Sequence, residues 1–407
     1  MHFLAKRFYR GANYTKRNVT QPAIKVATVG IAMGLAIMLL SISVLMGFKQ
    51  ELTKKITGFT AHIEVLNIET LQIPDAFPIC LPPYIENKIC NLEEVKNIQK
   101  VSQKIGVLKT GLHFSPIILK GIDEGYDTTY LQESLIEGKL PTLKKDTATY
   151  QIAVSKCIAE LLNLKVGQRI YAYFFEESIK MRRMSIVGIY ETNIKHFDES
   201  IVLTDRYSVC KLNGWNNQQC SELEIKATSL GDIPKILPEI QKNIAGFPKL
   251  TAISVGEHYP QVFTWLNILN TNVWVILILM AGVAVFTVCS GLLVIMLERT
   301  PAIGILKAMG ASNSQVRATF IRLAMFITAK GVLWGNAIAL TLLLLQHYFK
   351  LIQLDPSHYY VTEVHVVISP IIILIINIVV VLLIFLSLFI PTLTISKISP
   401  TKAIKFD

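Results

Sequence analysis

Four long stretches without any Asp, Glu, Lys or Arg restrict this chain to folds that cross a membrane. They comprise residues 26–48, 259–297, 331–349 and 364–396 and hold 19 to 39 residues each. About 20 apolar residues are enough for a helix to cross the hydrocarbon core of a bilayer. The sequence therefore predicts four transmembrane helices, and a composition that is 52% hydrophobic and 17% charged agrees with this prediction.

The first stretch could be confused with a secretion signal, because basic residues precede it. Its 23 uncharged residues exceed the usual apolar core of a signal, and no small-residue cleavage pattern closes it. We therefore expect it to be retained as a membrane helix.

Positive charge is concentrated in three segments that flank the predicted helices. Residues 1–25 carry a net charge of +6, residues 298–322 of +3 and residues 397–407 of +2, which together equal the whole excess of +11. Lys and Arg near the ends of spans remain on the cytoplasmic side. Both termini and the 298–322 segment are therefore expected inside the cell. The rest of the chain is neutral in balance, so its basic character gives no support to nucleic-acid binding.

This orientation predicts a linear order of nine segments. They are a cytoplasmic N-terminal segment (1–25), the first transmembrane helix with a periplasmic stalk (26–57), a periplasmic α+β domain (58–257), a stalk with the second helix (258–297), a cytoplasmic helix (298–315), the third helix (316–349), a short periplasmic loop (350–363), the fourth helix (364–396) and a cytoplasmic tail (397–407).

The α+β assignment follows from alternating patterns between the first two spans. We expect strands at 62–66, 169–175, 184–190 and 221–225, and helices at 91–101, 156–162 and 233–244. Phe48, Leu52 and Ile56 recur every four residues, so the first span is expected to continue outward as a helix. Val262 and Leu266 indicate a similar stalk before the second span.

The connector ERTPAIGILKAMGAS at residues 298–312 is more structured than a simple link between spans requires. Thr300 suits a helix N-cap, Pro301 the first helical position, and Gly310 the left-handed position after the helix end. Ser312 and Gln315 have the form of a capping box for the next helix. The sequence thus predicts a short helix followed by a fixed glycine corner.

One face of this short helix is predicted to be apolar and to contain Ile303, Leu306 and Met309, with Ile305 beside it. A helix of this length is marginal in water by itself, so the face must be covered. Either it lies in the headgroup region as an interfacial helix, or it binds a groove of a cytoplasmic partner.

Small residues and methionines in the spans predict close helix contacts or a pliable apolar cavity. Gly30 and Gly34, and likewise Gly331 and Gly335, have the small-x-x-x-small spacing. The predicted set for helix packing or a substrate cavity comprises Gly30, Gly34, Met38, Met46, Phe48, Phe263 and Leu266. Lys330 precedes the third uncharged stretch and either extends to the membrane surface or meets an ionic partner.

No catalytic or metal-binding signature is recognisable. The chain has no G-x-x-x-x-G-K-[ST] phosphate loop, no G-x-S-x-G elbow and no His or Cys pairs at zinc spacing. We expect a non-enzymatic subunit without a cofactor of its own. Cys80 with Cys90, and Cys210 with Cys220, could form disulfides or remain free thiols.

Several of these stretches resemble a known family. The sequence GIAMGLAIMLLSISVLMGFKQEL at 30–52, the connector and SPTKAIKFD at 399–407 are similar to the FtsX-like permeases, most closely the Lol lipoprotein-releasing subunits (LolC/LolE-like). The sequence IAVSKCIAELLNLKVGQRI at 152–170 is similar to the periplasmic core domain of MacB. Thr300, Pro301, Gln168 and Lys330 depart from the usual residues of the family.

The resemblance implies a type VII ABC transporter that works by mechanotransmission in the bacterial inner membrane. A LolD-like ATPase dimer would bind ATP and Mg and hold the connector in a groove. A second permease subunit, identical or related, would complete the complex. The cargo would be a lipoprotein taken from the outer leaflet and passed to a LolA-like periplasmic carrier. The coupling residues carried over are Glu298, Arg299, Ile303, Gly304, Leu306, Lys307, Met309 and Gly310.

Three other functions remain open from the sequence. One is MacB-like efflux of a periplasmic substrate, although MacB carries its ATPase on the same chain. A second is an FtsX-like regulator of a cell-wall hydrolase. A membrane enzyme is the third, and the absence of catalytic signatures weakens it.

Overall fold

The computed structural model describes residues 20–73, 76–111, 113–144, 146–175, 179–355, 359–389 and 391. The basic residues before position 20 and the predicted tail at 397–407 lie outside this range. The chain divides into two compact units. A helical unit comprises Met1–Lys49, Trp265–Gln353 and Glu363–Asp407, and a mixed unit comprises Gln50–Thr264 and Leu354–Thr362.

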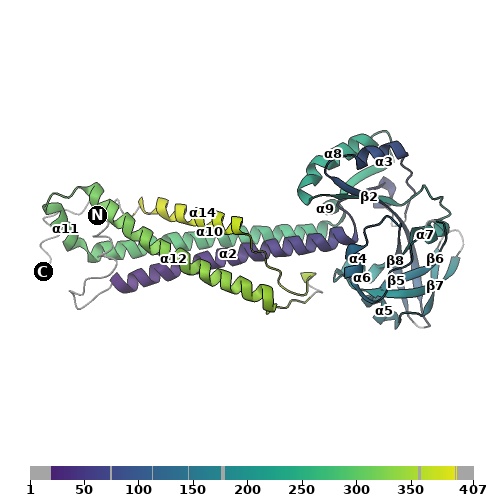
Figure 1. The fold of residues 1–407 in the computed structure, drawn as a ribbon, viewed down its shortest axis with the longest axis horizontal. Helices are drawn as coiled ribbons and strands as arrows, with labels where there is room; N and C mark the ends of the chain where they lie inside the picture. The colour runs from purple at the N-terminus through teal and green to yellow at the C-terminus, as the bar shows by residue number, and fades with distance from the viewer. Residues whose placement is uncertain are drawn as a thin grey trace. The chain divides into compact units, whose positions relative to one another are not determined.

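Within the described residues, four helices are long and apolar enough to cross a membrane, as the sequence predicts (Figure 1). They are α2 (Thr20–Phe59), α10 (Pro260–Glu298), α12 (Asn313–Phe349) and α14 (Pro370–Ser387). The expected helical continuation of the first span is confirmed, since α2 runs unbroken to Phe59. The fourth predicted stretch begins at 364, but its helix starts only at Pro370 because proline favours the first turn and disfavours helix before it.

Glycines allow the helices of this unit to approach closely. A Cβ atom built on Gly30 of α2 would lie 2.6 Å from Thr287 Cγ2 of α10. On the other side of α2, a Cβ on Gly331 of α12 would lie 2.7 Å from Ile31 Cβ, and one on Gly335 would lie 2.9 Å from the carbonyl oxygen of Ala32. Each glycine therefore removes the atom that would separate two helices.

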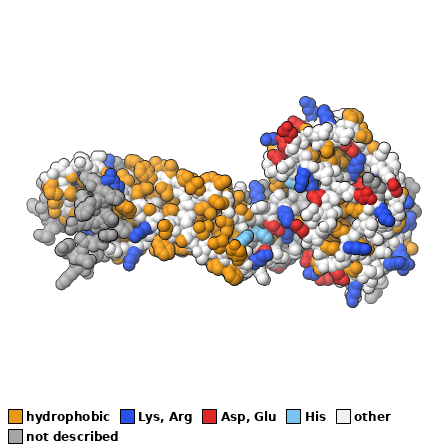
Figure 2. All heavy atoms as spheres, in the orientation of Figure 1, with side chains coloured by type: hydrophobic (Ala, Val, Ile, Leu, Met, Phe, Trp, Pro, Cys, Tyr) orange, Lys and Arg blue, Asp and Glu red, His pale blue; other side chains and the backbone are white. Residues whose placement is uncertain are grey.

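One apolar core joins the four helices, and it includes Ile31 and Leu35 of α2, Leu292 of α10, Leu323 of α12 and Val380 of α14. Hydrophobic side chains also cover much of the outer surface of this unit that Figure 2 shows, whereas charged side chains are spread over the mixed unit. An apolar exterior is what a helix bundle surrounded by lipid requires.

The mixed unit is built on a ten-stranded sheet with the strand order β10-β1-β9-β2-β3-β8-β5-β7-β4, in which β6 pairs with β2 and β7. The strands are β1 (Ile63–Asn67), β2 (Val95–Lys109), β3 (Phe114–Ile122), β4 (Leu135–Gly138), β5 (Gln151–Ser155), β6 (Arg169–Phe175), β7 (Ile179–Tyr190), β8 (Ile201–Asp205), β9 (Glu222–Ala227) and β10 (Leu250–Ser254). Most neighbours are antiparallel, while β3 pairs with β8 and β5 with β7 in parallel.

Short helices cover this sheet in separate groups. They are α3 (Pro83–Cys90), α4 (Thr129–Glu133), α5 (Lys156–Leu162), α6 (Lys195–Ser200), α7 (Arg206–Asn213), α8 (Ile233–Ile244) and α9 (Val255–His258). Ile85 of α3 and Ile236 of α8 share one core, and Ile158 of α5 and Val209 of α7 share another. The predicted α+β class is therefore confirmed.

One predicted helix of this unit is wrong. Residues 91–101 were expected to be helical, but Val95–Lys109 forms strand β2. Val95, Ile98 and Val101 are spaced by three residues, as on a helix face. The pairing with β9 shifts register between Val95 and Asn97, and this bulge brings Val95 and Ile98 to the same core, whereas Val101 lies in another core.

The six cysteines are all free thiols. Cys80, Cys90 and Cys157 are exposed, while Cys210 and Cys220 are buried in the mixed unit. Cys210 Sγ lies 3.4 Å from Ser102 Oγ. Neither of the two possible disulfides is formed.

Candidate functional site

The connector forms helix α11 (Thr300–Ala308), which ends in a fixed corner at one end of the helical unit (Figure 1). Gly310 has φ +95°, which side chains with a Cβ rarely adopt. The N–H of Ala311 donates to the Leu306 carbonyl and that of Gly310 to the Lys307 carbonyl, both at 3.0 Å. This is a Schellman motif, so the predicted role of Gly310 is confirmed.

Helix α12 starts directly after this corner with the predicted capping box. The backbone N–H of Gln315 donates to Ser312 Oγ at 3.3 Å, and the N–H of Ser312 donates to Gln315 Oε1 at 3.0 Å. These two bonds satisfy donors that a helix start otherwise leaves free. The direction in which the chain leaves α11 is therefore set by local hydrogen bonds.

The start of α11 differs from the prediction. Arg299 is the N-cap residue, and its side chain makes no capping hydrogen bond to α11. Thr300, the predicted N-cap, is the first helical residue, and its hydroxyl donates to the Met296 carbonyl of α10 at 3.1 Å. The error is one residue, because the threonine hydroxyl bonds back to α10 instead of forward to α11.

The predicted common face of Ile303, Leu306 and Met309 is also wrong. Ile303 is only 1% exposed and packs in the bundle core with Val316 and Phe320 of α12, whereas Met309 is 72% exposed. Two positions six residues apart on an α-helix point about 120° apart, since each residue adds about 100°. Other helices of the same chain thus bury much of the apolar surface that a short helix such as α11 needs to bury.

The outward side of α11 remains apolar. Ile305 is 54% exposed, and Pro301 and Ala308 are exposed as well. Leu297, the penultimate residue of α10 and four positions before Pro301, is 74% exposed. We call Leu297, Pro301, Ile305, Ala308 and Met309 the α11 patch. The sequence signal that could have found it is the four-residue spacing of 297, 301 and 305.

The other predicted coupling residues border this patch. Glu298, Arg299, Leu306 and Lys307 are half-buried, and Gly304 is buried next to Ile303. An apolar surface with charged residues at its margin is typical of a protein-binding helix.

The predicted packing residues occupy two different regions. Gly30 and Gly34 face α10, and Met38 is buried in the bundle core. Phe48 meets Trp265 edge to face with ring centroids 6.1 Å apart. Phe263 belongs to the mixed unit, where it packs beside the core around Phe59. Met46 is half-buried and Leu266 is buried.

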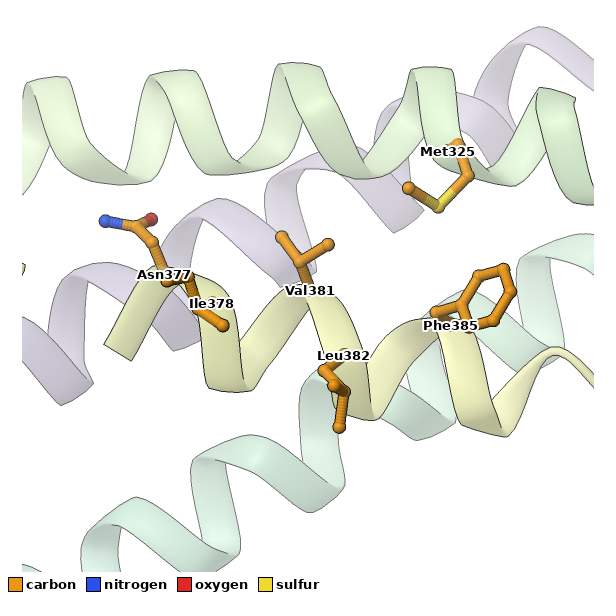
Figure 3. Close-up of a pocket in the computed structure, with 6 residues that line it drawn as sticks. All are labelled: Met325, Asn377, Ile378, Val381, Leu382 and Phe385. Carbon is orange, nitrogen blue, oxygen red and sulfur yellow. The ribbon is translucent and has the colours of Figure 1, made fainter. Parts of the chain in front are cut away.

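A shallow apolar groove of about 430 Å³ runs between α12 and α14 (Figure 3). Met325 lines it from α12, and Ile378, Val381, Leu382 and Phe385 line it from α14. At one end Asn377 exchanges two hydrogen bonds with Asn336 of α12, at 2.8 and 3.0 Å. The paired amides satisfy each other, so they fix the position of α14 against α12.

The last residue of α2 is held inside the mixed unit by a group of charged and aromatic side chains. Lys120 Nζ donates to the Phe59 carbonyl at 2.8 Å and to Glu224 Oε1 at 2.6 Å. The hydroxyl of Tyr126 donates to Glu224 Oε2 at 2.9 Å. The Phe59 ring stacks on Phe197 with centroids 4.6 Å apart. We call Phe59, Lys120, Tyr126, Phe197 and Glu224 the anchor cluster.

Burial dominates the electrostatics around this cluster. It raises the pKa of Glu224, an effect that the positive charge of Lys120 opposes and that of Glu64 strengthens. Burial, with the nearby Glu64 and Glu224, raises the pKa of Glu222 to about 8. Two fully ionised carboxylates here would repel each other in a medium that screens them weakly.

The start of α10 is connected to the same aromatic group. Its preceding helix, α9, places His258 against Glu64 of β1. Burial opposes protonation of His258, but the hydrogen bond to Glu64 and the charges of Glu64 and Glu222 outweigh it and raise the histidine pKa. Tyr259 meets Phe197 edge to face at 5.4 Å. The end of α2 and the start of α10 are therefore fixed to one another.

The loop after α12 also belongs to the mixed unit. Residues Leu354–Thr362 cluster with it, and Lys55 Nζ donates to the Tyr360 carbonyl at 3.1 Å. Neither this contact nor the anchor cluster was foreseen. A charged Lys120 within a strand-like run was the available signal, but its partner Glu224 is 104 residues away.

Chemically, the described residues offer surfaces and rigid joints. Across them, no group of three or more His, Cys, Asp or Glu could hold a metal ion. The α11 patch is an exposed apolar surface, and the anchor cluster is a buried joint at the end of α2.

Residues 274–400 match the family described as FtsX-like permease C-terminal. The chain is 23% identical over 92% of its length to the lipoprotein-releasing system transmembrane protein LolC of Buchnera aphidicola subsp. Acyrthosiphon pisum, of which the match covers 91%. It is 21% identical over 84% of its length to LolE of Haemophilus influenzae, of which 82% is covered. The resemblance to FtsX-like permeases is thereby confirmed.

Among solved structures, the extracellular domain of the ABC-type transporter YknZ matches 47% of this chain and 99% of its own, with 15% identity and a TM-score of 0.32. The periplasmic region of MacB from Actinobacillus actinomycetemcomitans matches 50% of this chain and 93% of its own, with 11% identity and a TM-score of 0.34.

Proposed function

We propose, from the premise that residues 274–400 are FtsX-like, that this chain is the membrane subunit of a lipoprotein-releasing ABC transporter. A separate ATPase dimer binds ATP and Mg and moves α11. A second permease subunit completes the complex. The complex extracts lipoproteins from the outer leaflet of the inner membrane and passes them to a soluble periplasmic carrier, by a type VII mechanism.

The single observation that carries this proposal is the α11 patch. It presents exposed Ile305 and Met309 on a helix whose other side is fixed in the bundle by Ile303. An ATPase that binds this patch displaces the ends of α10 and α12 with it, because the corner at Gly310 is closed by hydrogen bonds. Force is then delivered to two spans at once.

The length of α2 supports transmission to the far side of the membrane. Its 40 residues make a helix roughly 60 Å long, whereas the hydrocarbon core is about 30 Å thick. The anchor cluster holds its end by a buried ion pair and ring contacts. Movement of α2 therefore acts on the mixed unit directly.

The positive-inside rule supports the orientation of the proposal. It favours a cytoplasmic location for the termini and α11, where an ATPase would be, and a periplasmic location for the mixed unit. In this arrangement ATP is hydrolysed on one side while the substrate is handled on the other, and the lipoprotein does not cross the bilayer.

Reconstitution tests the proposal. The chain is purified with the candidate ATPase, inserted into liposomes with an acylated lipoprotein, and supplied with a soluble lipoprotein acceptor. ATP-dependent transfer that requires both chains is the expected result. An ATPase that copurifies but drives no transfer would refute lipoprotein release, and a cell-wall hydrolase in crosslinked precipitates would then favour a regulator.

A further inference from the structure

A groove between α2 and α12 combines two lysines with an apolar floor. Its volume is about 640 Å³, within the roughly 300–1,000 Å³ that small-molecule sites occupy. Each helix contributes residues at intervals of four. The sets are Lys25, Val29 and Met33 from α2 and Lys330, Trp334 and Ile338 from α12. On each helix, a lysine is therefore followed by two apolar residues, one on each of the next two turns.

The two lysines line the same end of the groove because α2 and α12 run in the same direction and touch through glycine. A Cβ on Gly331 would lie 3.2 Å from the Thr28 carbonyl oxygen, and one on Gly335 would lie 3.1 Å from Leu35 Cβ. Residue numbers rise together along this contact, so the helices are parallel and Lys25 and Lys330 share one end of the groove.

The sequence places this end at a membrane surface. Lys25 is the last charged residue before the uncharged stretch 26–48, and Lys330 is the last before 331–349. Lysines at the ends of spans keep their ammonium groups at headgroup level, while their stems lie along apolar surface. The rest of the groove continues into the hydrocarbon region.

The charge of the groove is positive. Of the ten described residues that line it, two are lysines and none is Asp or Glu. Both lysines are exposed, as are Val29, Met33 and Trp334. Basic pockets between spans on the cytoplasmic side suit anionic lipid headgroups, and each nearby lysine contributes on the order of a fivefold gain in affinity.

We infer that this groove binds an anionic phospholipid. The phosphate group lies between Lys25 and Lys330, and one acyl chain follows Val29, Met33 and Ile338 with Trp334 at its side. A second copy of this chain fits less well, because its segments predicted at the same membrane surface (1–25, 298–322 and 397–407) are net positive and would repel the two lysines. The inference goes beyond transport of lipoproteins and depends only on α2 and α12 crossing the membrane.

The test uses the full-length chain purified in detergent and delipidated. Native mass spectrometry measures binding of phosphatidylglycerol and of phosphatidylcholine with identical acyl chains. We expect tighter binding of phosphatidylglycerol, which the double variant Lys25→Gln/Lys330→Gln weakens by about thirtyfold. The control Lys49→Gln/Lys350→Gln removes two lysines near the other ends of the same uncharged stretches and should leave binding unchanged.

A second measurement locates the acyl chain. Phosphatidylglycerol with brominated acyl chains should quench tryptophan fluorescence of the wild type, and this quenching should be lost in Trp334→Phe. Met33→Trp fills the floor of the groove and should abolish lipid binding although both lysines remain. Equal binding of the two lipids, or equal loss in the control, would overturn the inference. Crosslinking of Met33→Cys to a second copy in native membranes would overturn it as well.

Discussion

The α11 corner and the anchor cluster hold helix ends in opposite ways. At the corner, backbone hydrogen bonds around Gly310 fix the geometry and leave Ile305 and Met309 exposed. In the anchor cluster, side chains bury the end of α2 and pair Lys120 with Glu224. This difference is the one expected if the α11 patch meets a partner, as proposed, and the anchor cluster serves only as a joint.

Mutations in these two regions should therefore differ in their effect on the stability of the protein. Changes in the anchor cluster should lower stability, because a buried charge left without its partner is expensive. Changes on the α11 patch should leave stability nearly unaltered and impair only coupling.

Lys120→Met should destabilise the mixed unit by about 3–5 kcal/mol, because it leaves Glu224 buried without its cation. Lys54→Met is the matched control, since Lys54 forms an exposed ion pair with Glu133 at 2.9 Å. The control should cost at most about 1 kcal/mol. Urea unfolding of the full-length chain in detergent measures both, and similar losses would contradict the special role of the cluster.

Two isoleucines of α11 separate its inner side from its outer side. Ile303→Ala removes a buried core side chain and should cost about 2–4 kcal/mol. Ile305→Ala, two residues away and exposed, should cost less than about 0.5 kcal/mol. Thermal unfolding of the two variants measures this difference. Equal unfolding midpoints would mean that α11 does not pack as described.

Stability of the mixed unit should fall as pH rises from about 6 to 9. Folding raises the pKa of Glu222 from its ordinary 4.5 to about 8, so the folded chain retains a proton that the unfolded chain has lost. This contribution is complete below pH 4.5 and lost as pH rises through 8. The raised pKa of His258 acts in the same direction.

Glu222→Gln checks the main source of this dependence. It retains an acceptor for Gln103 Nε2, which donates to the Glu222 carboxylate at 2.8 Å. The variant should be more stable than the wild type at pH 9 by about 2 kcal/mol, and the pH slope should flatten. An unchanged slope in urea midpoints measured from pH 6 to 9 would exclude Glu222 as its origin.

Gly310→Ala should lower stability less than Lys120→Met or Ile303→Ala. Open space surrounds the site, so only the positive φ opposes the new Cβ, at a cost of about 1 kcal/mol. Gly246→Ala, which also has open space but no positive φ, should be close to neutral. Thermal unfolding of both variants measures the difference, and equal midpoints would show that the corner is not fixed by its glycine.

The sequence predicted features whose causes are local. Gly310, the Ser312–Gln315 capping box, helix α5 and helix α8 follow from residues close together in the chain, and each was found. Residues 91–101 were misassigned because Val95, Ile98 and Val101 are spaced as on a helix face, although they lie in a bulged strand. In that case pairing with β9 outweighed the local pattern.

The candidate site was predicted only in part for the same reason. Which side of α11 is buried depends on Val316 and Phe320 of another helix, so Ile303 was assigned to the wrong surface. The anchor cluster depends on Lys120 and Glu224, and no local rule joins residues 104 positions apart. Long-range packing had to come from the structure.

The coupling role of the α11 patch is the central claim, and one comparison tests it most directly. Ile305→Asp/Met309→Asp and the control Asn313→Asp/Ser314→Asp each add two charges at exposed positions of the same corner. ATP-dependent lipoprotein transfer is measured in liposomes with the ATPase. We predict that the rate of transfer falls at least tenfold in the patch variant, although it inserts into the membrane normally, while the control keeps the wild-type rate. A wild-type rate in the patch variant would contradict the coupling role of the patch.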